Sequence, residues 1–215
     1  MIANIASYID FTLLKPNAKV ADYTKLCSDA AANKFYSVCV PPFMVKSCKE
    51  MLDSSEVKIT TVIGFPLGYS TPEIKASEAA FAIKQGADDI DMVINISEAK
   101  SGNFDYLKKE LVMVREATQN KTLKVIIETC YLSKEEIAKI SRLVSDCKAD
   151  FVKTSTGFGP AGALLEDIAI IKSAIRPETK IKAAGGIRTY ADAEAFVNAG
   201  ASRIGSSAII VSPKA

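Results

Sequence analysis

Short runs of apolar, largely β-branched residues recur at regular intervals along the 215-residue chain. Each run is four to seven residues long, which is typical of buried strands and too short for most helices. The pattern therefore predicts eight strands, over residues 8–14, 37–40, 59–65, 90–95, 123–129, 151–156, 181–187 and 202–206.

Between these runs the apolar residues change to the spacing of an amphipathic helix. Several of these segments begin with Ser, Thr or Asp, the residue types that cap helix N-termini. Helices are predicted over residues 22–33, 71–85, 106–119, 134–147, 164–174 and 190–199.

The alternation of strand and helix predicts the fold class. Nearly continuous apolar strands separated by helices are typical of a parallel sheet that helices cover. Eight such units without a linker favour a closed (β/α)8 TIM barrel, formed as a single domain over residues 1–215. An open doubly wound sheet is the structural alternative. In a barrel of this kind, we expect the active site at the carboxyl ends of the strands.

Charge and hydropathy exclude several classes of function. The net charge is +2, with Lys and Arg scattered among Asp and Glu, so the basic stripe of a nucleic-acid-binding protein is not expected. No segment approaches the roughly 18 consecutive apolar residues of a membrane-spanning helix. The N-terminus also lacks a basic region followed by an apolar run. We therefore expect a cytoplasmic protein with no membrane partner.

Cysteine and histidine usage restricts the available chemistry. The five cysteines are widely spaced without a Cys-x-x-Cys pair, which indicates free thiols in a reducing compartment. Histidine is absent, although zinc sites and general acid–base catalysis commonly use it. No clustered Asp or Glu spacing suggests a magnesium site either, so no metal is expected.

Two lysines lie inside predicted strands, Lys153 in Phe-Val-Lys-Thr-Ser and Lys182 in Ile-Lys-Ala-Ala. Buried ammonium groups are rare because desolvation disfavours the charged form. Strand alternation directs Lys153 into the barrel, and neighbouring strands lie roughly 4.8 Å apart, so the two amines can approach each other. Desolvation and a nearby like charge both lower a lysine pKa, which would leave a neutral amine able to attack a carbonyl. For either lysine alone, a side chain that reaches the surface is the alternative.

Asp91 is a carboxylate within the apolar strand 90–95 and can face the same interior. Beside a protonated lysine it could orient that lysine and relay protons. A purely structural ion pair is the alternative. We expect Asp88 and Asp89 in the exposed turn before this strand, and Glu128 in a supporting role within the charge network.

An anion site is predicted after the last two strands. Barrels often bind phosphate there through backbone N–H groups, hydroxyls and a helix N-terminus. Glycines in these places are otherwise ordinary turn residues. The residues that could form the site are Gly157, Gly185, Gly186, Arg188, Gly205, Ser206 and Ser207.

Eight ordered blocks of sequence resemble the deoxyribose-phosphate aldolases, a family of class I aldolases. They are Ile-Asp-Phe-Thr-Leu-Leu-Lys-Pro (9–16), Ser-Val-Cys-Val (37–40), Thr-Val-Ile-Gly-Phe-Pro-Leu-Gly (61–68), Asp-Ile-Asp-Met-Val-Ile-Asn (89–95), Val-Ile-Ile-Glu-Thr (125–129), Phe-Val-Lys-Thr-Ser-Thr-Gly-Phe (151–158), Lys-Ala-Ala-Gly-Gly-Ile-Arg-Thr (182–189) and Arg-Ile-Gly-Ser-Ser (203–207). The resemblance implies a (β/α)8 barrel that reversibly cleaves 2-deoxy-D-ribose 5-phosphate to D-glyceraldehyde 3-phosphate and acetaldehyde. It also implies a homodimer that needs neither a metal nor an organic cofactor.

Residue by residue, the resemblance makes Lys153 the Schiff-base nucleophile, Lys182 the cation that lowers its pKa, and Asp91 the partner in proton transfer. Asp10 and Thr12 match positions near the substrate, and the seven residues of the predicted anion site match its phosphate group.

Two of the departures from the family pattern are Phe11, which replaces a common histidine, and Pro41, which replaces an asparagine. Neither departure alters the two lysines or Asp91. Two alternative functions stay open, namely a Schiff-base aldolase for a different phosphorylated sugar and a non-catalytic barrel that binds phosphorylated sugars.

Overall fold

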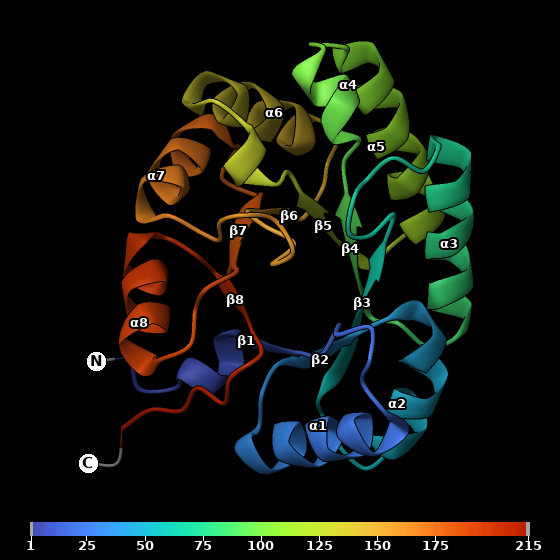
Figure 1. The fold of residues 1–215 in the computed structure, drawn as a ribbon, viewed down its shortest axis with the longest axis vertical. Helices are drawn as coiled ribbons and strands as arrows, with labels where there is room; N and C mark the ends of the chain where they lie inside the picture. Colours follow the sequence, from blue (N-terminus) through green and yellow to red (C-terminus); the bar gives the residue numbers. More distant parts are fainter. Residues whose placement is uncertain (1, 214–215) are drawn as a thin grey trace.

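The computed structural model describes residues 2–213 and contains a closed barrel of parallel strands (Figure 1). Each strand pairs with its successor, and β1 also pairs with β8, with Ile9 beside Ile204. This last pairing confirms the predicted (β/α)8 barrel and excludes the open sheet. The strands are β1 (Ile9–Thr12), β2 (Ser37–Val40), β3 (Lys58–Ile63), β4 (Asp89–Val93), β5 (Thr122–Ile126), β6 (Phe151–Lys153), β7 (Lys180–Ala184) and β8 (Arg203–Ser206).

Helices surround the barrel and bury its outer face (Figure 1). They are α1 (Val20–Asn33), α2 (Val45–Met51), α3 (Pro72–Lys84), α4 (Ile96–Lys100), α5 (Phe104–Thr118), α6 (Lys134–Asp146), α7 (Leu165–Ala174) and α8 (Tyr190–Ala199). Short 3₁₀ turns add η1 (Ile5–Tyr8), η2 (Pro42–Met44) and η3 (Thr129–Tyr131). The periodic pattern predicts all of these α-helices except the two short ones, α2 and α4.

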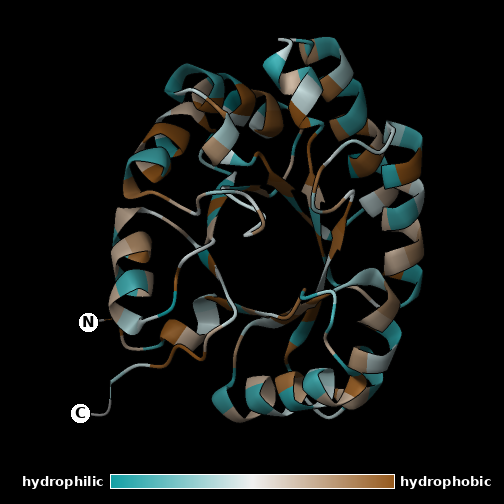
Figure 2. Cartoon of the chain, viewed as in Figure 1, coloured by the Kyte–Doolittle hydropathy of each residue, from teal (hydrophilic) through white to brown (hydrophobic). Residues whose placement is uncertain are grey.

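The strands divide their side chains between two environments. Val152, Ile181 and Ile204 point outward into the apolar layer between the barrel and the helices, where they are fully or almost fully buried. Figure 2 shows both apolar (brown) and hydrophilic (teal) positions along the strands of the barrel. The alternate residues of the same strands, among them Lys153 and Lys182, point into the barrel. The apolar core is therefore a ring around a polar interior.

Six of the eight predicted strands extend beyond the observed ones at their carboxyl ends, whereas β2 and β8 end where the pattern predicts. The apolar run 151–156 predicts a six-residue strand, whereas β6 ends at Lys153. Thr154 and Ser155 are fully buried, so burial continues although the strand does not. The backbone leaves the sheet there to form the loops above the barrel, a change that apolar periodicity does not record.

A buried ion pair holds two of these loops. Lys75 on α3 donates to the carbonyls of Gly68 and Val93 and to the carboxylate of Glu110 on α5. Neither charged side chain is exposed, so the pair joins the loop after β3 to the end of β4. The same loop places the ring of Phe65 edge-on against Phe158, with ring centroids 5.3 Å apart.

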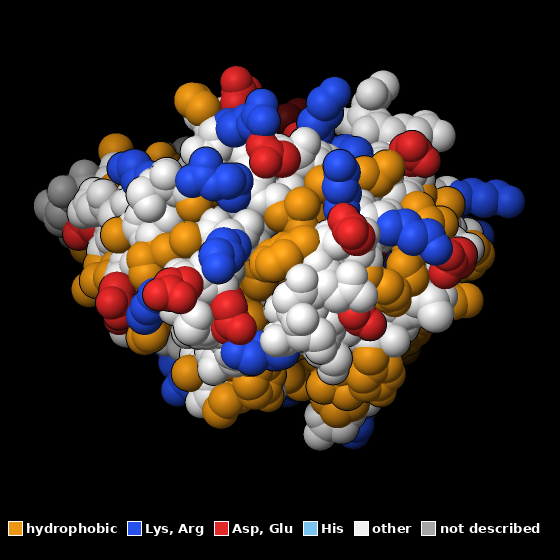
Figure 3. All heavy atoms as spheres, turned by 90° about the horizontal axis from the view of Figure 1, so that it is seen from above, with side chains coloured by type: hydrophobic (Ala, Val, Ile, Leu, Met, Phe, Trp, Pro, Cys, Tyr) orange, Lys and Arg blue, Asp and Glu red, His pale blue; other side chains and the backbone are white. Residues whose placement is uncertain are grey.

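The exposed charges are of both signs on the face of the molecule that Figure 3 shows. On the face shown in Figure 3, Lys and Arg side chains are interspersed with Asp and Glu, and no basic stripe is visible there. Among residues 2–213, no helix combines the length and the apolar character that crossing a membrane requires.

Candidate active site

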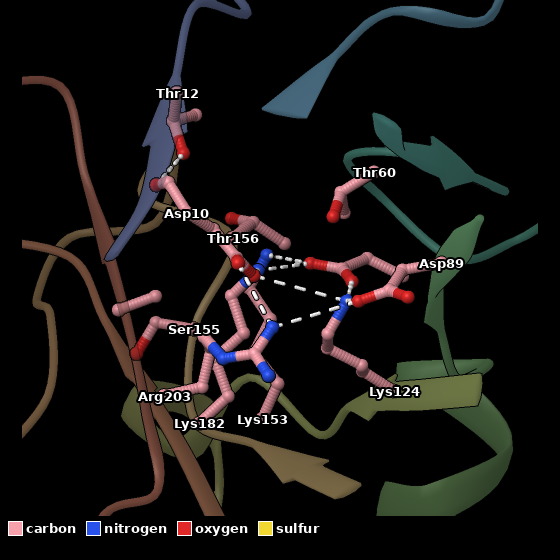
Figure 4. A network of polar contacts seen from close by, with 12 residues as sticks. Asp10, Thr12, Thr60, Asp89, Lys124, Lys153, Ser155, Thr156, Lys182 and Arg203 are labelled. Atoms are coloured by element: carbon pink, nitrogen blue, oxygen red, sulfur yellow. Dashed lines mark hydrogen bonds and ion pairs between the residues drawn. The ribbon is translucent and has the colours of Figure 1, made fainter. Parts of the chain in front are cut away.

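The interior of the barrel brings together Lys153, Lys182 and Asp91, which come from β6, β7 and β4. Figure 4 labels the two lysines within the network of polar contacts. The Nζ atom of Lys153 donates to Oδ2 of Asp91 at 2.8 Å, and Nζ of Lys182 donates to the same oxygen at 2.7 Å. Strand pairing explains this arrangement, because Lys153 lies directly opposite Lys182 in the register of β6 and β7. The two amines therefore share one carboxylate oxygen.

Asp10 lies beneath this group on β1. Its Oδ2 accepts a hydrogen bond from Nζ of Lys182 at 2.5 Å, and its Oδ1 accepts one from the hydroxyl of Ser37 at 2.8 Å. Asp10 is fully buried and does not line the cavity above the lysines. The structure therefore places it against Lys182, and its predicted position near the substrate stays a prediction.

Lys153 differs from its neighbours in its electrostatic surroundings. Burial in the barrel lowers the pKa of Lys153 below the usual 10.5. Asp91 opposes this shift, and the positive charge of Lys182 adds to it. Both causes predicted from the sequence, desolvation and the second lysine, therefore act on Lys153, and desolvation is the larger of the two.

Lys182 and Asp91 have the opposite tendency, and both favour their charged forms. Burial lowers the pKa of Lys182, but Asp10 and Asp91 outweigh burial and raise it above 10.5. Burial likewise raises the pKa of Asp91, but Lys124, Lys153 and Lys182 outweigh it and hold this pKa well below 3.8. The arrangement thus separates one lysine that releases its proton readily from one that keeps it.

Three further charged residues contact this group of lysines and aspartates, and none of them is among the residues predicted for the site. Lys124 on β5 contacts Asp91 at 3.1 Å and Asp89 at 2.7 Å. Arg203 on β8 contacts Asp10 at 3.1 Å. Lys124 could have been found by the rule that identifies Lys153, since it too interrupts an apolar strand.

The placement of Asp89 corrects an expectation. The sequence predicted this residue in the exposed turn before the strand, but it is the first residue of β4 and only 1% exposed. Its side chain points into the barrel because it has the same parity as Asp91. The sequence does not reveal which of several adjacent carboxylates is buried. A change of one residue in where the strand begins exchanges the side chains that point inward with those that point outward.

Glu128 is the second correction. The predicted supporting role in the lysine network is wrong, because its carboxylate accepts hydrogen bonds from the backbone N–H and the hydroxyl of Thr156. Glu128 is buried, and its hydrogen bonds connect the loop after β5 to the loop after β6. Its backbone adopts a left-handed conformation with φ +52°.

A cavity of about 350 Å³ opens above the lysines at the carboxyl ends of the strands. Lys153 and Thr12 belong to its lining. So do all seven residues of the predicted anion site, namely Gly157, Gly185, Gly186, Arg188, Gly205, Ser206 and Ser207. Strand ends distant in sequence therefore place the amine and the predicted anion-binding residues around one hollow.

Two glycines explain how the wall of this cavity is built. Gly185 has φ +88°, a backbone conformation that residues other than glycine rarely adopt. This glycine turns the chain out of β7. At Gly205, a Cβ atom would lie 3.3 Å from Cε of Lys182, so glycine leaves room for the lysine stem. The hydroxyl of Ser206 is already engaged, because it donates to the carbonyl of Ile187 at 2.7 Å.

Lys15 also lines the cavity, although it is not among the residues predicted for the site. It follows β1 in the block Leu-Leu-Lys-Pro, and its side chain is exposed. A basic residue immediately after a barrel strand is the signal that could have found it.

The described residues also bear on metal binding. Within residues 2–213, no group of three or more His, Cys, Asp or Glu side chains is arranged to hold a metal ion. The three carboxylates inside the barrel instead face Lys and Arg side chains.

A closed barrel with a buried lysine cluster beneath a strand-end cavity is typical of barrel enzymes, and comparisons with known proteins identify the family. The family described as DeoC/LacD family aldolase matches residues 5–207. A deoxyribose-phosphate aldolase of Thermoanaerobacter sp. (strain X514) is 50% identical over 208 residues, which cover 95% of this chain and 93% of that protein. The chain therefore belongs to the DeoC/LacD aldolase family, whose members are lyases.

Solved structures agree with this assignment. A putative deoxyribose-phosphate aldolase from Coccidioides immitis is 38% identical, with a TM-score of 0.93, over 95% of this chain and 82% of that one. A deoxyribose phosphate aldolase from Aeropyrum pernix, described as having a unique tetrameric structure, is 32% identical with a TM-score of 0.87. That match covers 94% of this chain and 86% of the Aeropyrum chain. The homodimer expected for this chain stays a prediction.

Proposed function

We propose that this protein reversibly cleaves 2-deoxy-D-ribose 5-phosphate to D-glyceraldehyde 3-phosphate and acetaldehyde through a Schiff base on Lys153, in the cytoplasm. The observation that carries this function is a buried lysine with a lowered pKa on the lining of a cavity, held by Asp91 beside the cation Lys182. The names of the relatives point to the same substrate.

The proposed reaction begins with the neutral amine of Lys153, which attacks the C1 carbonyl of the open-chain sugar. Loss of water gives an iminium ion, in which C1 can accept an electron pair. Removal of the proton from the C3 hydroxyl breaks the C2–C3 bond, and the electron pair moves into the iminium to give an enamine. D-Glyceraldehyde 3-phosphate leaves, C2 takes up a proton, and hydrolysis of the new iminium releases acetaldehyde and restores the amine.

In this reaction, Asp91 would position both lysines and pass protons between the substrate and Lys182. Lys182 would stay protonated and keep positive charge beside the nucleophile. The phosphate of the substrate would occupy the part of the cavity lined by Gly157, Gly186 and Arg188. Binding energy from this remote group would then orient the reacting carbon atoms.

Incubation of the purified protein with 2-deoxy-D-ribose 5-phosphate tests the proposed function. We expect acetaldehyde and D-glyceraldehyde 3-phosphate in equal amounts, each measured by an enzyme-coupled assay. Cleavage of another phosphorylated sugar, but not this one, would favour an aldolase of different specificity. Binding of the sugar phosphate without products or adduct would favour the non-catalytic barrel.

The phosphate site leads to a prediction about Arg188. Replacing it with methionine should raise KM for 2-deoxy-D-ribose 5-phosphate by about 10-fold to 100-fold, the loss expected for a hydrogen bond to a charged group. Cleavage of unphosphorylated 2-deoxyribose should change little, since that sugar has no phosphate to bind. Arg176→Met, which removes an arginine 66% exposed in the segment between α7 and β7, is the matched control. An equal loss with both sugars would contradict the assignment of Arg188 to the phosphate.

A further inference from the structure

The floor of the barrel contains a second, deeper pair of charges below the proposed site. Asp89 is the first residue of β4 and Arg203 is the first residue of β8, so both lie at the end of the barrel opposite the cavity. Both are buried, and Nη1 of Arg203 lies 3.6 Å from Oδ2 of Asp89. The guanidinium group stacks on the ring of Tyr36, with its central carbon 3.2 Å from the ring centroid.

Each member of this deeper pair is connected to the site by one intervening residue of opposite charge. Arg203 contacts Asp10 at 3.1 Å, and Asp10 accepts a hydrogen bond from Lys182. Asp89 contacts Lys124 at 2.7 Å, and Lys124 contacts Asp91 at 3.1 Å. The two chains of contacts meet where Asp91 also accepts a hydrogen bond from Lys182. Figure 4 labels Asp10, Asp89, Lys124, Lys182 and Arg203.

The charges in this network do not balance when every group is ionised. Within residues 2–213, it joins four cationic side chains to three carboxylates, and all seven groups are buried. A buried network with one surplus positive charge is unfavourable, since little water is present to screen it. Release of one proton removes the surplus.

Lys153 is the member placed to release that proton. It contacts one carboxylate, Asp91, whereas Lys124 contacts all three and Lys182 contacts two. The charged and titratable groups around it are Asp10 on β1, Cys39 on β2, Asp89 and Asp91 on β4, Lys124 on β5, Lys182 on β7 and Arg203 on β8.

We propose that Arg203 and Asp89 are positioning residues whose opposite charges tune how readily Lys153 loses its proton, although neither forms an ion pair with Lys153. Arg203 supplies the surplus positive charge that drives proton release from Lys153. Asp89 offsets part of that charge through Lys124. This role rests on the proposed function only in that the neutral amine is the reactive form.

Charge-changing variants separate this role from a purely structural one. Arg203→Met removes a cation and should move the midpoint for proton loss at Lys153 to higher pH. Asp89→Asn removes an anion and should move it to lower pH. The expected size is about one pH unit in each direction, which corresponds to a 10-fold change in reactivity on the acidic side. The double variant should return close to the original midpoint, because it removes one charge of each sign.

The midpoint can be measured without any aldolase activity. The full chain is labelled with a trace amount of acetic anhydride over a series of pH values, and acetylation of Lys153 is quantified by peptide mass spectrometry. Only the neutral amine reacts, so the extent of labelling follows its proton loss. Failure to cleave 2-deoxy-D-ribose 5-phosphate would reject the proposed function and would leave this measurement unaffected.

Matched controls come from the exposed pair of Arg176 and Asp146, whose closest atoms are 2.6 Å apart. Arg176→Met and Asp146→Asn should leave the midpoint of Lys153 unchanged. Arg203→Lys should leave the midpoint of Lys153 close to that of the unmodified protein, because it preserves the positive charge. It removes only the planar stacking on Tyr36.

The assignment of Arg203 and Asp89 would be overturned if Arg203→Met and Asp89→Asn shifted the midpoint of Lys153 in the same direction. It would also be overturned if neither variant shifted the midpoint. A double variant that keeps the shift of either parent would also overturn it. If Arg203→Met does not fold, Asp89→Asn decides alone, since a lower midpoint supports the role and an unchanged or higher one contradicts it.

Discussion

Replacement of Lys153 by methionine should lower kcat/KM for cleavage of 2-deoxy-D-ribose 5-phosphate by a factor of about 10⁴ or more. Loss of a covalent nucleophile removes the route through the iminium and leaves only binding and orientation. Folding should survive, because Asp91 keeps Lys182 and Lys124 as partners. Steady-state kinetics and thermal unfolding of the same preparation measure both effects.

The control for this variant is Lys25→Met, which removes a lysine whose side chain is 74% exposed on α1. Its kinetics should match those of the unmodified protein. Activity of the Lys153→Met variant within tenfold of the original would show that another group forms the covalent bond or that no covalent bond forms.

The Asp91→Asn variant should show the second large effect, on both stability and rate. An amide cannot neutralise the buried cations of Lys124 and Lys182, so the free energy of unfolding should fall by about 3–5 kcal/mol. The rate should fall by about 10²–10⁴-fold, the range for loss of a group that transfers protons. Urea unfolding and steady-state kinetics measure the two losses.

The stability loss should depend on pH. Burial acts to raise the pKa of Asp91, but the surrounding lysines outweigh it and hold the folded-state pKa well below 3.8. The stability that this carboxylate contributes is therefore complete above its unfolded-state pKa and is lost as pH falls through the lower folded-state value. The difference between the two proteins should be full at pH 7 and should shrink in strong acid.

Asp146→Asn is the matched control for Asp91→Asn, because Asp146 belongs to an exposed ion pair with Arg176. Removal of such a pair should change the free energy of unfolding by only about 0–1 kcal/mol. A loss of similar size in both variants would contradict the view that Asp91 holds buried charge.

Much of the barrel could be predicted from the sequence because its determinants are local. The apolar runs mark all eight strands, and the run 37–40 matches β2 residue for residue. The helix α2, with only seven residues after two prolines, was missed because so short a segment has no clear periodicity.

The full membership of the charge network could not be predicted, because it depends on which strands lie beside or opposite one another in the closed barrel. Lys153 and Lys182 stand out in sequence, and the resemblance to a known family assigns their roles. Asp10 and Arg203 are 193 residues apart, and only closure of the sheet between β1 and β8 brings them together. Asp89 shows the same limit, since its burial follows from where β4 begins.

The central claim is that Lys153, and not its charged neighbour, is the amine that bonds to the substrate. Sodium borohydride added during turnover, followed by peptide mass mapping, tests it most directly. We predict an N-ethyl adduct from acetaldehyde on Lys153, absent in the Lys153→Met variant. An adduct confined to Lys182, or active protein that gives no adduct at all, would contradict the account.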